Sequence, residues 1–158
     1  DAAGHPEWVD FPRDGNNWSY HYARRQWRLR DDPELRYHYL ADFDVAMLKL
    51  IRSNGAIEYA MPRVLQMHEE HKTIIFERNG LFFFFNFHPS QSFPDYAIEV
   101  LPGEYVLQLD VDDRSFGGHA RLARDQHYFT QPVVENNTLR NMLRVYLPCR
   151  SALVLKKI

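Results

Sequence analysis

The residue types best suited to chemistry are concentrated in segment 4–27, which reads GHPEWVDFPRDGNNWSYHYARRQW. Three Trp, two Tyr and an Asn pair stand there among Arg and His residues, with few aliphatic side chains and no helical or strand periodicity. Aromatic faces beside Arg and Asn can bind a sugar, because a pyranose ring combines an apolar C–H face with an equator of hydroxyl groups. The same residues could instead fold a long loop back on itself, with Arg stacked on Trp.

Two other groups of side chains raise the question of a metal ion. His68 and His71 are three residues apart, but no third ligand stands in register, which favours polar linker residues. The turn DVDD at 110–113 faintly resembles a calcium loop, yet Arg121 stands at the twelfth position, where such a loop needs Glu. The sequence has no phosphate-binding glycine loop, Cys/His zinc pattern or nucleophile elbow. We expect no metal ion here.

Cys149 is the only cysteine, which excludes an internal disulfide and fits a reducing, cytoplasmic compartment. Because it lies in an apolar run, we expect a buried structural thiol and not a nucleophile. Gly117-Gly118 predicts a tight backbone path, since glycine tolerates positive φ.

The composition is that of an ordinary globular domain. The 158 residues are 45% hydrophobic and 25% charged, enough for one sizeable core. A net charge of -2 argues against a nucleic-acid surface and favours a neutral substrate. No apolar run approaches the roughly 20 residues of a membrane helix, and no signal-peptide pattern occurs. We expect a soluble protein that binds neither nucleic acid nor membrane.

One amphipathic helix is predicted over residues 33–53. Asp32 and Pro33 read as an N-cap followed by proline at the first helical position. An apolar stripe follows at spacings of three and four, made of Leu40, Phe43, Met47, Leu50 and Ile51. The pair Asn54-Gly55 predicts the end of the helix by left-handed capping. A single helix cannot bury this stripe alone, so a partner is required.

From residue 72 onward the pattern changes to short β-rich runs separated by Pro, Gly, Asp and Asn. Strands are predicted at 72–78, 81–87, 96–100, 104–110, 127–130, 143–146 and 152–157. The Asn-Gly pair at 79–80 is a strong hairpin signal. In a later strand, Tyr105, Leu107 and Leu109 are expected on one face. Short strands with turns between them predict an antiparallel sandwich.

The run LFFFFNF at 81–87 is apolar on both faces, with Phe82 and Phe84 opposite the other large side chains. A sandwich strand with one wet face would alternate apolar and polar residues. Exposing Phe82 and Phe84 would forfeit roughly 1.5 to 3 kcal/mol each. We expect them either to face a barrel domain or the helix 33–53, or to lie in a central strand buried inside its own domain.

Five ordered motifs link the chain to one family. Segment 4–27 is followed by FFFFNFHPSQSFPDY at 82–96, LPGEY at 101–105, FGGHARL at 116–122 and RVYLPCRSALVL at 144–155. Together they resemble 1,4-alpha-glucan branching enzymes of glycoside hydrolase family 13, from the end of the catalytic barrel to the C-terminus. The resemblance covers nearly the whole chain. One departure is Asp1-Ala2-Ala3, where the family usually has Asn-Glu-Phe.

The resemblance implies a mainly β fold, an antiparallel β-sandwich of the alpha-amylase C-terminal all-beta domain type. An irregular loop and one or two helices from the end of a (β/α)8 barrel would precede it. Residues 1–58 would then belong to the barrel and residues 59–158 to the sandwich, with 57–67 as a connecting segment. The missing catalytic barrel would be the chain's partner.

The implied function is the formation of α-1,6 branches in glycogen by retaining transglycosylation, without a cofactor. Such a reaction needs two carboxylates about 5 to 5.5 Å apart. The family carries them in motifs of the Gly-Phe-Arg-x-Asp and Asn-His-Asp kind, which this chain lacks. Glu7 and Asp10 do not lie where the family places its catalytic groups. We therefore expect a C-terminal portion with no catalytic residues, inactive alone.

In the resembled family this loop would lie near the face where barrel active sites are built. Five of its residues become candidate contacts with an α-glucan such as glycogen or a starch-like polymer: Trp8, Arg13, Asn17, Trp18 and Tyr20. Arg24 and Arg25 are expected to pair with acidic groups or to pack on Trp27. The alternative is a stand-alone carbohydrate-binding β-sandwich module, which should present exposed, coplanar aromatic rings on one sheet face or loop edge.

Overall fold

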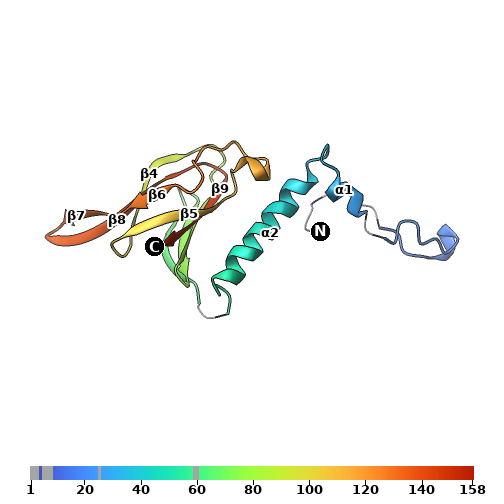
Figure 1. The fold of residues 1–158 in the computed structure, drawn as a ribbon, viewed down its shortest axis with the longest axis horizontal. Helices are drawn as coiled ribbons and strands as arrows, with labels where there is room; N and C mark the ends of the chain where they lie inside the picture. Colours follow the sequence, from blue (N-terminus) through green and yellow to red (C-terminus); the bar gives the residue numbers. More distant parts are fainter. Residues whose placement is uncertain (1–3, 5–8, 25, 59–60) are drawn as a thin grey trace. The chain divides into compact units, whose positions relative to one another are not determined.

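The computed structural model describes residue 4 and residues 9–24, 26–58 and 61–158. The chain divides into two compact units, Asp1–Val45 and Ala46–Ile158. In Figure 1 the first unit runs from blue to cyan, and the second continues through green and yellow to the red final strand. The domain boundary predicted between residues 58 and 59 stays a prediction.

The first unit holds two short helices and the beginning of a long one, namely η1 (Asp14–Asn16), α1 (Trp27–Asp31) and α2 (Tyr37–Ser53). The helix predicted from residue 33 begins at Tyr37 instead. Asp32 Oδ1 accepts a hydrogen bond from the N–H of Glu34 at 3.0 Å, which ties the expected capping residues into a separate turn. The sequence did not predict α1, because a five-residue helix with no buried side chain has no readable periodicity.

The end of α2 lies in the second unit and confirms the prediction from Asn54-Gly55. Gly55 has a φ of 57°. Its N–H donates to the carbonyl oxygen of Arg52 at 3.1 Å, and the N–H of Ala56 donates to that of Ile51 at 3.0 Å. This is the paired bonding of a Schellman motif, which satisfies the last carbonyl groups of the helix.

Two side chains far along the sequence, one from a hairpin turn and one from the final strand, hold this helix end in place. Asn79 Nδ2 donates to the carbonyl oxygen of Asn54 at 2.6 Å, and Lys156 Nζ donates to Asn54 Oδ1 at 2.7 Å. Leu50 and Ile51 of α2 pack against a buried apolar cluster on the sheet. The helix stripe therefore has part of its partner within this unit.

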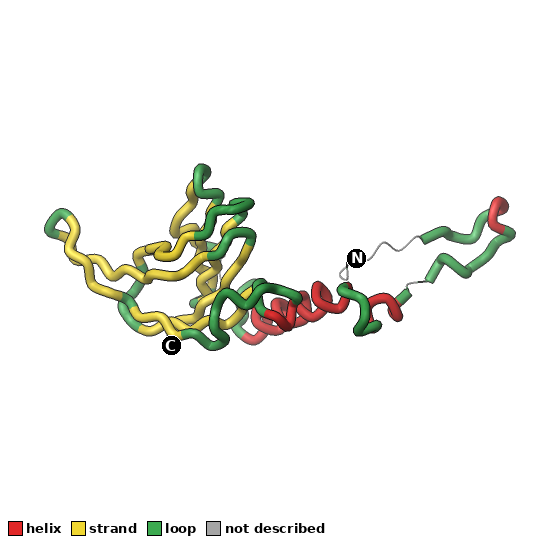
Figure 2. Tube along the Cα trace, turned by 90° about the horizontal axis from the view of Figure 1, so that it is seen from above, coloured by secondary structure: helices red, strands yellow, loops and turns green. Residues whose placement is uncertain are grey.

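The second unit is built from strands, with a one-turn helix η2 (Arg114–Phe116) between them. The strands are β1 (Arg63–His68), β2 (Thr73–Arg78), β3 (Leu81–Asn86), β4 (Phe93–Glu99), β5 (Glu104–Asp110), β6 (His127–Phe129), β7 (Gln131–Glu135), β8 (Thr138–Leu147) and β9 (Ser151–Lys157). They pair antiparallel in a six-stranded sheet, β1-β2-β3-β9-β5-β6, and a three-stranded sheet, β4-β8-β7 (Figures 1 and 2). The predicted antiparallel β fold is confirmed.

Two strands were not predicted. β1 lies in the segment interpreted as a connector, and β7 contains Pro132. Both are edge strands of their sheets and are mostly exposed, so neither shows the apolar alternation of a half-buried strand. The hairpin predicted at 79–80 is confirmed, with positive φ at both Asn79 and Gly80.

Phe82 and Phe84 lie inside the sandwich, where they are 6% and 0% exposed. They belong to one buried cluster with residues of both sheets, including Tyr105 and Leu143. The hypothesis that they face a barrel or the helix is therefore wrong, and burial in a central strand is correct. Phe83, on the opposite face, is the residue that packs against the cluster near α2.

That outer face of the six-stranded sheet carries a row of aromatic rings. Phe76 stacks on Phe83 and Phe85, with ring centroids 4.7 and 5.9 Å apart. Phe85 stacks on Phe87 at 5.6 Å, and Phe87 is 60% exposed. In each of these three pairs the ring planes are within 14° of parallel. We call these four residues the phenylalanine row.

A β-bulge reverses the faces of β5 partway along the strand. Its pairing with β9 shifts register between Leu107 and Leu109. Leu107 joins the core, whereas Leu109 packs against the outer cluster. The prediction that Leu109 shares a face with Tyr105 and Leu107 is therefore wrong. Because one extra residue switches the side-chain direction, Asp110 is turned inward and is 7% exposed.

Candidate functional site

Residues 10–22 of the first unit form an ordered loop that folds back on itself. The N–H of Asp10 donates to the carbonyl oxygen of Tyr22 at 3.1 Å, which joins the two ends. At the far end the N–H groups of Asn16 and Trp18 both donate to the carbonyl oxygen of Arg13, at 3.1 and 3.0 Å. These bonds satisfy backbone groups that a loop without regular structure would leave to solvent.

Asp10 and Arg13 form an ion pair within this loop. Arg13 Nε lies 3.0 Å from Asp10 Oδ1, and Arg13 Nη2 lies 3.3 Å from Oδ2. Asn16 Nδ2 also donates to Asp10 Oδ2, at 3.0 Å. The bond from Arg13, and then that from Asn16, lower the pKa of the Asp10 carboxyl, while Asp10 raises the pKa of Arg13. A carboxylate held ionised in this way is poorly suited to act as a general acid.

The aromatic side chains of the loop are exposed, Phe11 by 71%, Trp18 by 65% and Tyr20 by 69%. Asn17 and Trp18 have φ values of 52° and 55°, which is uncommon for residues other than glycine. Arg13, a further predicted contact, lies at the same turn. The structure thus brings four of the five predicted contacts together in one loop.

The remaining predicted contact, Trp8, lies outside the described residues, as do Glu7 and Arg25. Arg24 is exposed, and Trp27 opens α1 with 65% of its surface exposed. Sequence reasoning missed Asn16, whose side chain lies at the centre of the loop. A signal was available, since Asp10, Arg13 and Asn16 recur at every third residue around an Asp-Gly turn.

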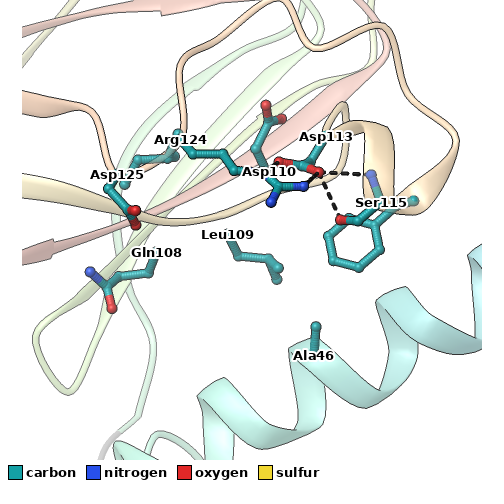
Figure 3. Close-up of a pocket in the computed structure, with 10 residues that line it drawn as sticks. Ala46, Gln108, Leu109, Asp110, Asp113, Ser115, Arg124 and Asp125 are labelled. Carbon is teal, nitrogen blue, oxygen red and sulfur yellow. Dashed lines mark hydrogen bonds and ion pairs between the residues drawn. The ribbon is translucent and has the colours of Figure 1, made fainter.

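A second candidate is a cavity of ≈ 240 Å³ in the second unit, shown in Figure 3. Its wall combines residues from α2, β5 and the loop after β5: Ala46, Leu107, Gln108, Leu109, Asp110, Asp113, Ser115, Phe116, Arg124 and Asp125. Arg124 donates twice to Asp113, at 2.6 and 2.7 Å, and Ser115 donates to the same carboxylate through its N–H and hydroxyl group. These polar groups in the cavity wall therefore form hydrogen bonds with one another.

The acidic turn that follows β5 is held by protein groups. Asp112 is 5% exposed and accepts hydrogen bonds from Arg121 Nε at 2.7 Å and from the N–H of His119 at 3.1 Å. Arg121, the residue at the twelfth position, thus supplies the positive charge that a calcium ion would bring. Gly118 passes so close that an added Cβ would lie 2.1 Å from the carbonyl oxygen of Asp112.

Asp110 and Tyr128 are buried polar groups at this end of the sandwich. Burial raises the pKa of Asp110 to about 6, and burial followed by the nearby Asp110 charge raises that of Tyr128 to about 12. Asp110 Oδ1 accepts the N–H of Asp112 at 2.9 Å, whereas no described residue bonds to the Tyr128 hydroxyl group. These shifts follow from desolvation, which disfavours the charged form of an acid.

The sequence also singled out Cys149 and the pair His68 and His71. Cys149 is half-buried, less than expected, and its thiol pKa is lowered by Ser92 and by Arg121. The rings of His68 and His71 lie 5.1 Å apart. Within the described ranges no group of three or more His, Cys, Asp or Glu could hold a metal ion. No helix among the described residues is long and apolar enough to span a membrane.

Comparison with known proteins bears on both units. Residues 64–158 match the family model described as alpha amylase, C-terminal all-beta domain. Proteins named 1,4-alpha-glucan-branching enzyme are similar over 98% of this chain: 46% identical in Dictyostelium discoideum, 50% in Candida glabrata and 48% in Felis catus. The chain spans only 22 to 23% of the length of these relatives, to whose C-terminal part it is similar.

Proposed function

Because the chain belongs to the family of alpha-amylase C-terminal all-beta domains, we propose that it forms the C-terminal part of a 1,4-alpha-glucan branching enzyme. The observation that carries this proposal is the identity of 46 to 50% with three proteins of that name over 98% of the chain. The similarity includes the N-terminal loop as well as the sandwich. The reaction would cut an α-1,4-linked glucan and join the released segment to a 6-hydroxyl group.

We further propose that the catalytic carboxylates are supplied by another part of the polypeptide. A retaining transglycosidase needs a nucleophile and a separate acid/base group. In the described loop, Asp10 is committed to Arg13 and Asn16. The role of the chain is then to present Arg13, Asn17, Trp18 and Tyr20 to an α-glucan, with Trp8 as a further predicted contact. The half-buried, unpaired Cys149 supports a reducing, cytoplasmic setting.

The catalytic barrel of the same protein is the proposed partner of the sandwich. The phenylalanine row supports this, because it leaves apolar surface on the outer face of the six-stranded sheet. Phe87 alone is 60% exposed, and covering such a ring stabilises an interface by roughly 1.5 to 3 kcal/mol. A row of this kind on a single folded unit is typical of a surface that another domain covers.

The same row argues against a stand-alone carbohydrate-binding module. Such a module would turn the flat faces of its rings outward, where a sugar can stack. Here the rings of Phe76, Phe83, Phe85 and Phe87 stack on one another, so their faces are used within the row. Exposed aromatic side chains outside the row include Phe11, Trp18 and Tyr20, which the loop 10–22 brings together.

The proposal can be tested with a hybrid protein. The corresponding C-terminal part of the Candida glabrata relative would be replaced by residues 1–158, and branch formation on amylose followed by iodine staining. We expect the hybrid to form branches and the purified chain alone to form none. An inactive hybrid that is folded by circular dichroism would contradict the proposed function, and so would turnover by the isolated chain.

A further inference from the structure

The side chain of Asn16 uses every hydrogen-bonding position that an amide has. Its Nδ2 donates to Asp10 Oδ2 and to the carbonyl oxygen of Phe11, both at 3.0 Å. Its Oδ1 accepts the N–H groups of Arg13, at 2.9 Å, and of Ser19, at 3.3 Å. An asparagine amide offers two donor hydrogens and two acceptor lone pairs, so all four are satisfied inside the loop.

These four bonds join both sides of the loop around its tip. Asp10 and Phe11 lie on the incoming side and Ser19 on the outgoing side. Between them Asn17 and Trp18 both adopt positive φ, which asparagine tolerates but which costs a bulky residue such as Trp18 roughly 1 to 2 kcal/mol. Strained backbone persists only where its surroundings fix it, and it is concentrated at sites that bind ligands. Backbone bonds hold the tip as well, and the Asn16 side chain adds four bonds that tie it to both sides of the loop.

The loop therefore combines an internal polar network with exposed aromatic rings. The side chains of Asp10 and Asn16 are partly buried and bonded to each other, Arg13 covers Asp10 from the exposed side, and the rings of Trp18 and Tyr20 are 65% and 69% exposed. A ligand that meets this surface is recognised mainly by apolar contact with ring faces. A neutral α-glucan fits that requirement, because each glucose unit has a C–H face that stacks on an aromatic ring.

We propose that Asn16 is the positioning residue of this loop, holding Trp18 and Tyr20 in the exposed conformation in which they bind an α-glucan chain by stacking. This inference rests on the glucan contact proposed above. Asn16 itself does not touch the glucan. Because Asn16 already orders the tip of the loop in the free protein, the entropic cost of ordering it does not have to be met when the glucan binds.

The test measures maltoheptaose binding to the 158-residue chain by calorimetry and by the indole N–H signals in NMR spectra. Trp18→Ala should abolish measurable binding. Asn16→Ala should weaken maltoheptaose binding about tenfold. A tenfold change in affinity corresponds to about 1.4 kcal/mol, which is close to the free energy of ordering one residue. Asn137→Gly is the matched control, because Asn137 also has positive φ, at 60°, in an exposed turn of the sandwich. It should leave the affinity unchanged.

Exchanging the donor Asn16 and the acceptor Asp10 distinguishes a positioning role of Asn16 from a general effect on stability. Asn16→Asp places a second carboxylate against Asp10 and should weaken binding at least as much as Asn16→Ala. The double variant Asp10→Asn/Asn16→Asp restores a donor facing an acceptor and should recover part of the affinity. All variants should unfold at the temperature of the unaltered chain, because the sandwich is untouched.

The outcomes are distinguishable. If the unaltered chain binds maltoheptaose and Asn16→Ala binds equally well, the positioning role is wrong while the proposed function stands. If binding falls only in parallel with the unfolding temperature, the role is merely structural and the inference also fails. If the unaltered chain shows no binding and no indole shift, the glucan contact is wrong, and the inference is overturned with it.

Discussion

Arg121 Nε donates to Asp112 Oδ2 at 2.7 Å, and this bond closes the loop after β5 on itself, while the same side chain reaches the turn between β8 and β9. The connection is completed by Arg121 Nη2, which donates to the carbonyl oxygen of Cys149 at 3.2 Å. Asp112 is 5% exposed, so its charge has little access to water. A buried carboxylate without its cation is strongly unfavourable.

Arg121→Ala should therefore lower the free energy of unfolding by about 3 kcal/mol at pH 7, because it leaves the Asp112 charge buried and unpaired. Urea denaturation followed by circular dichroism measures the loss. Arg114→Ala is the control, since Arg114 is exposed in the same loop and should change stability by less than about 0.5 kcal/mol. Equal effects of the two substitutions would contradict the importance of the pair.

Asp110→Asn should change how stability depends on pH. Burial raises the pKa of Asp110 in the folded chain to about 6, above its ordinary value of 3.8, so its favourable contribution is complete below pH 3.8 and lost as the pH rises through 6. Asparagine keeps the acceptor for the N–H of Asp112 but cannot ionise. The variant should gain stability relative to the unaltered chain between pH 4 and pH 7, as measured by urea denaturation at each pH.

The exposed Glu58→Gln serves as the control for that comparison and should show a much smaller gain. A stability difference for Asp110→Asn that stays constant from pH 4 to pH 7 would show that Asp110 titrates as it does in the unfolded chain.

Gly118→Ala should be far more destabilising than Gly80→Ala. At Gly118 a new Cβ would lie 2.1 Å from the backbone oxygen of Asp112, so the turn itself must move, with an expected loss of about 3 kcal/mol or more. At Gly80 an added Cβ meets nothing within 4 Å, and only the positive φ of 78° opposes it, at about 1 kcal/mol. Thermal unfolding of both variants measures the difference, and a reversed order would disprove the close approach.

Phe84→Ala and Phe87→Ala should separate the core from the outer face. Phe84 is fully buried, so its removal should cost about 3 to 5 kcal/mol in the isolated chain. Phe87 is 60% exposed, and its loss should cost less than about 1 kcal/mol there. In the branching-enzyme hybrid, Phe87→Glu should impair assembly or activity, which would be measured by yield and iodine staining. A fully active Phe87→Glu hybrid would argue against the barrel as partner of the phenylalanine row.

The turns of this fold could be predicted where a residue type has one preferred backbone conformation. Asn79-Gly80 and Asn54-Gly55 both predicted positive φ, and both were correct. The bulge in β5 could not be predicted, because the alternation Tyr105-Val-Leu-Gln-Leu reads as a regular strand until its partner β9 is known. The sequence also could not decide whether Phe82 points into the sandwich core or to its outside. Both faces of β3 are apolar, so periodicity does not show which face is buried in the core.

The loop 10–22 was recognisable from its composition, but its internal order was not. Composition placed Arg13 and Trp18 in one polar, aromatic segment. It did not reveal that Asn16 bonds to four neighbours, because such a network depends on the reversal of the chain at the tip. Residues that hold a loop in shape carry no periodic signal, unlike the residues of a helix stripe.

The place of β9 (Ser151–Lys157) between β3 and β5 has a consequence for synthesis on the ribosome. Neither β3 nor β5 has its shared neighbour until residue 157 has been translated, so the phenylalanine-rich hairpin waits with one edge open. Open, apolar edges in nascent chains invite association with other molecules. The sheet should therefore close late, and chaperones that shield such edges should be needed during production of the protein.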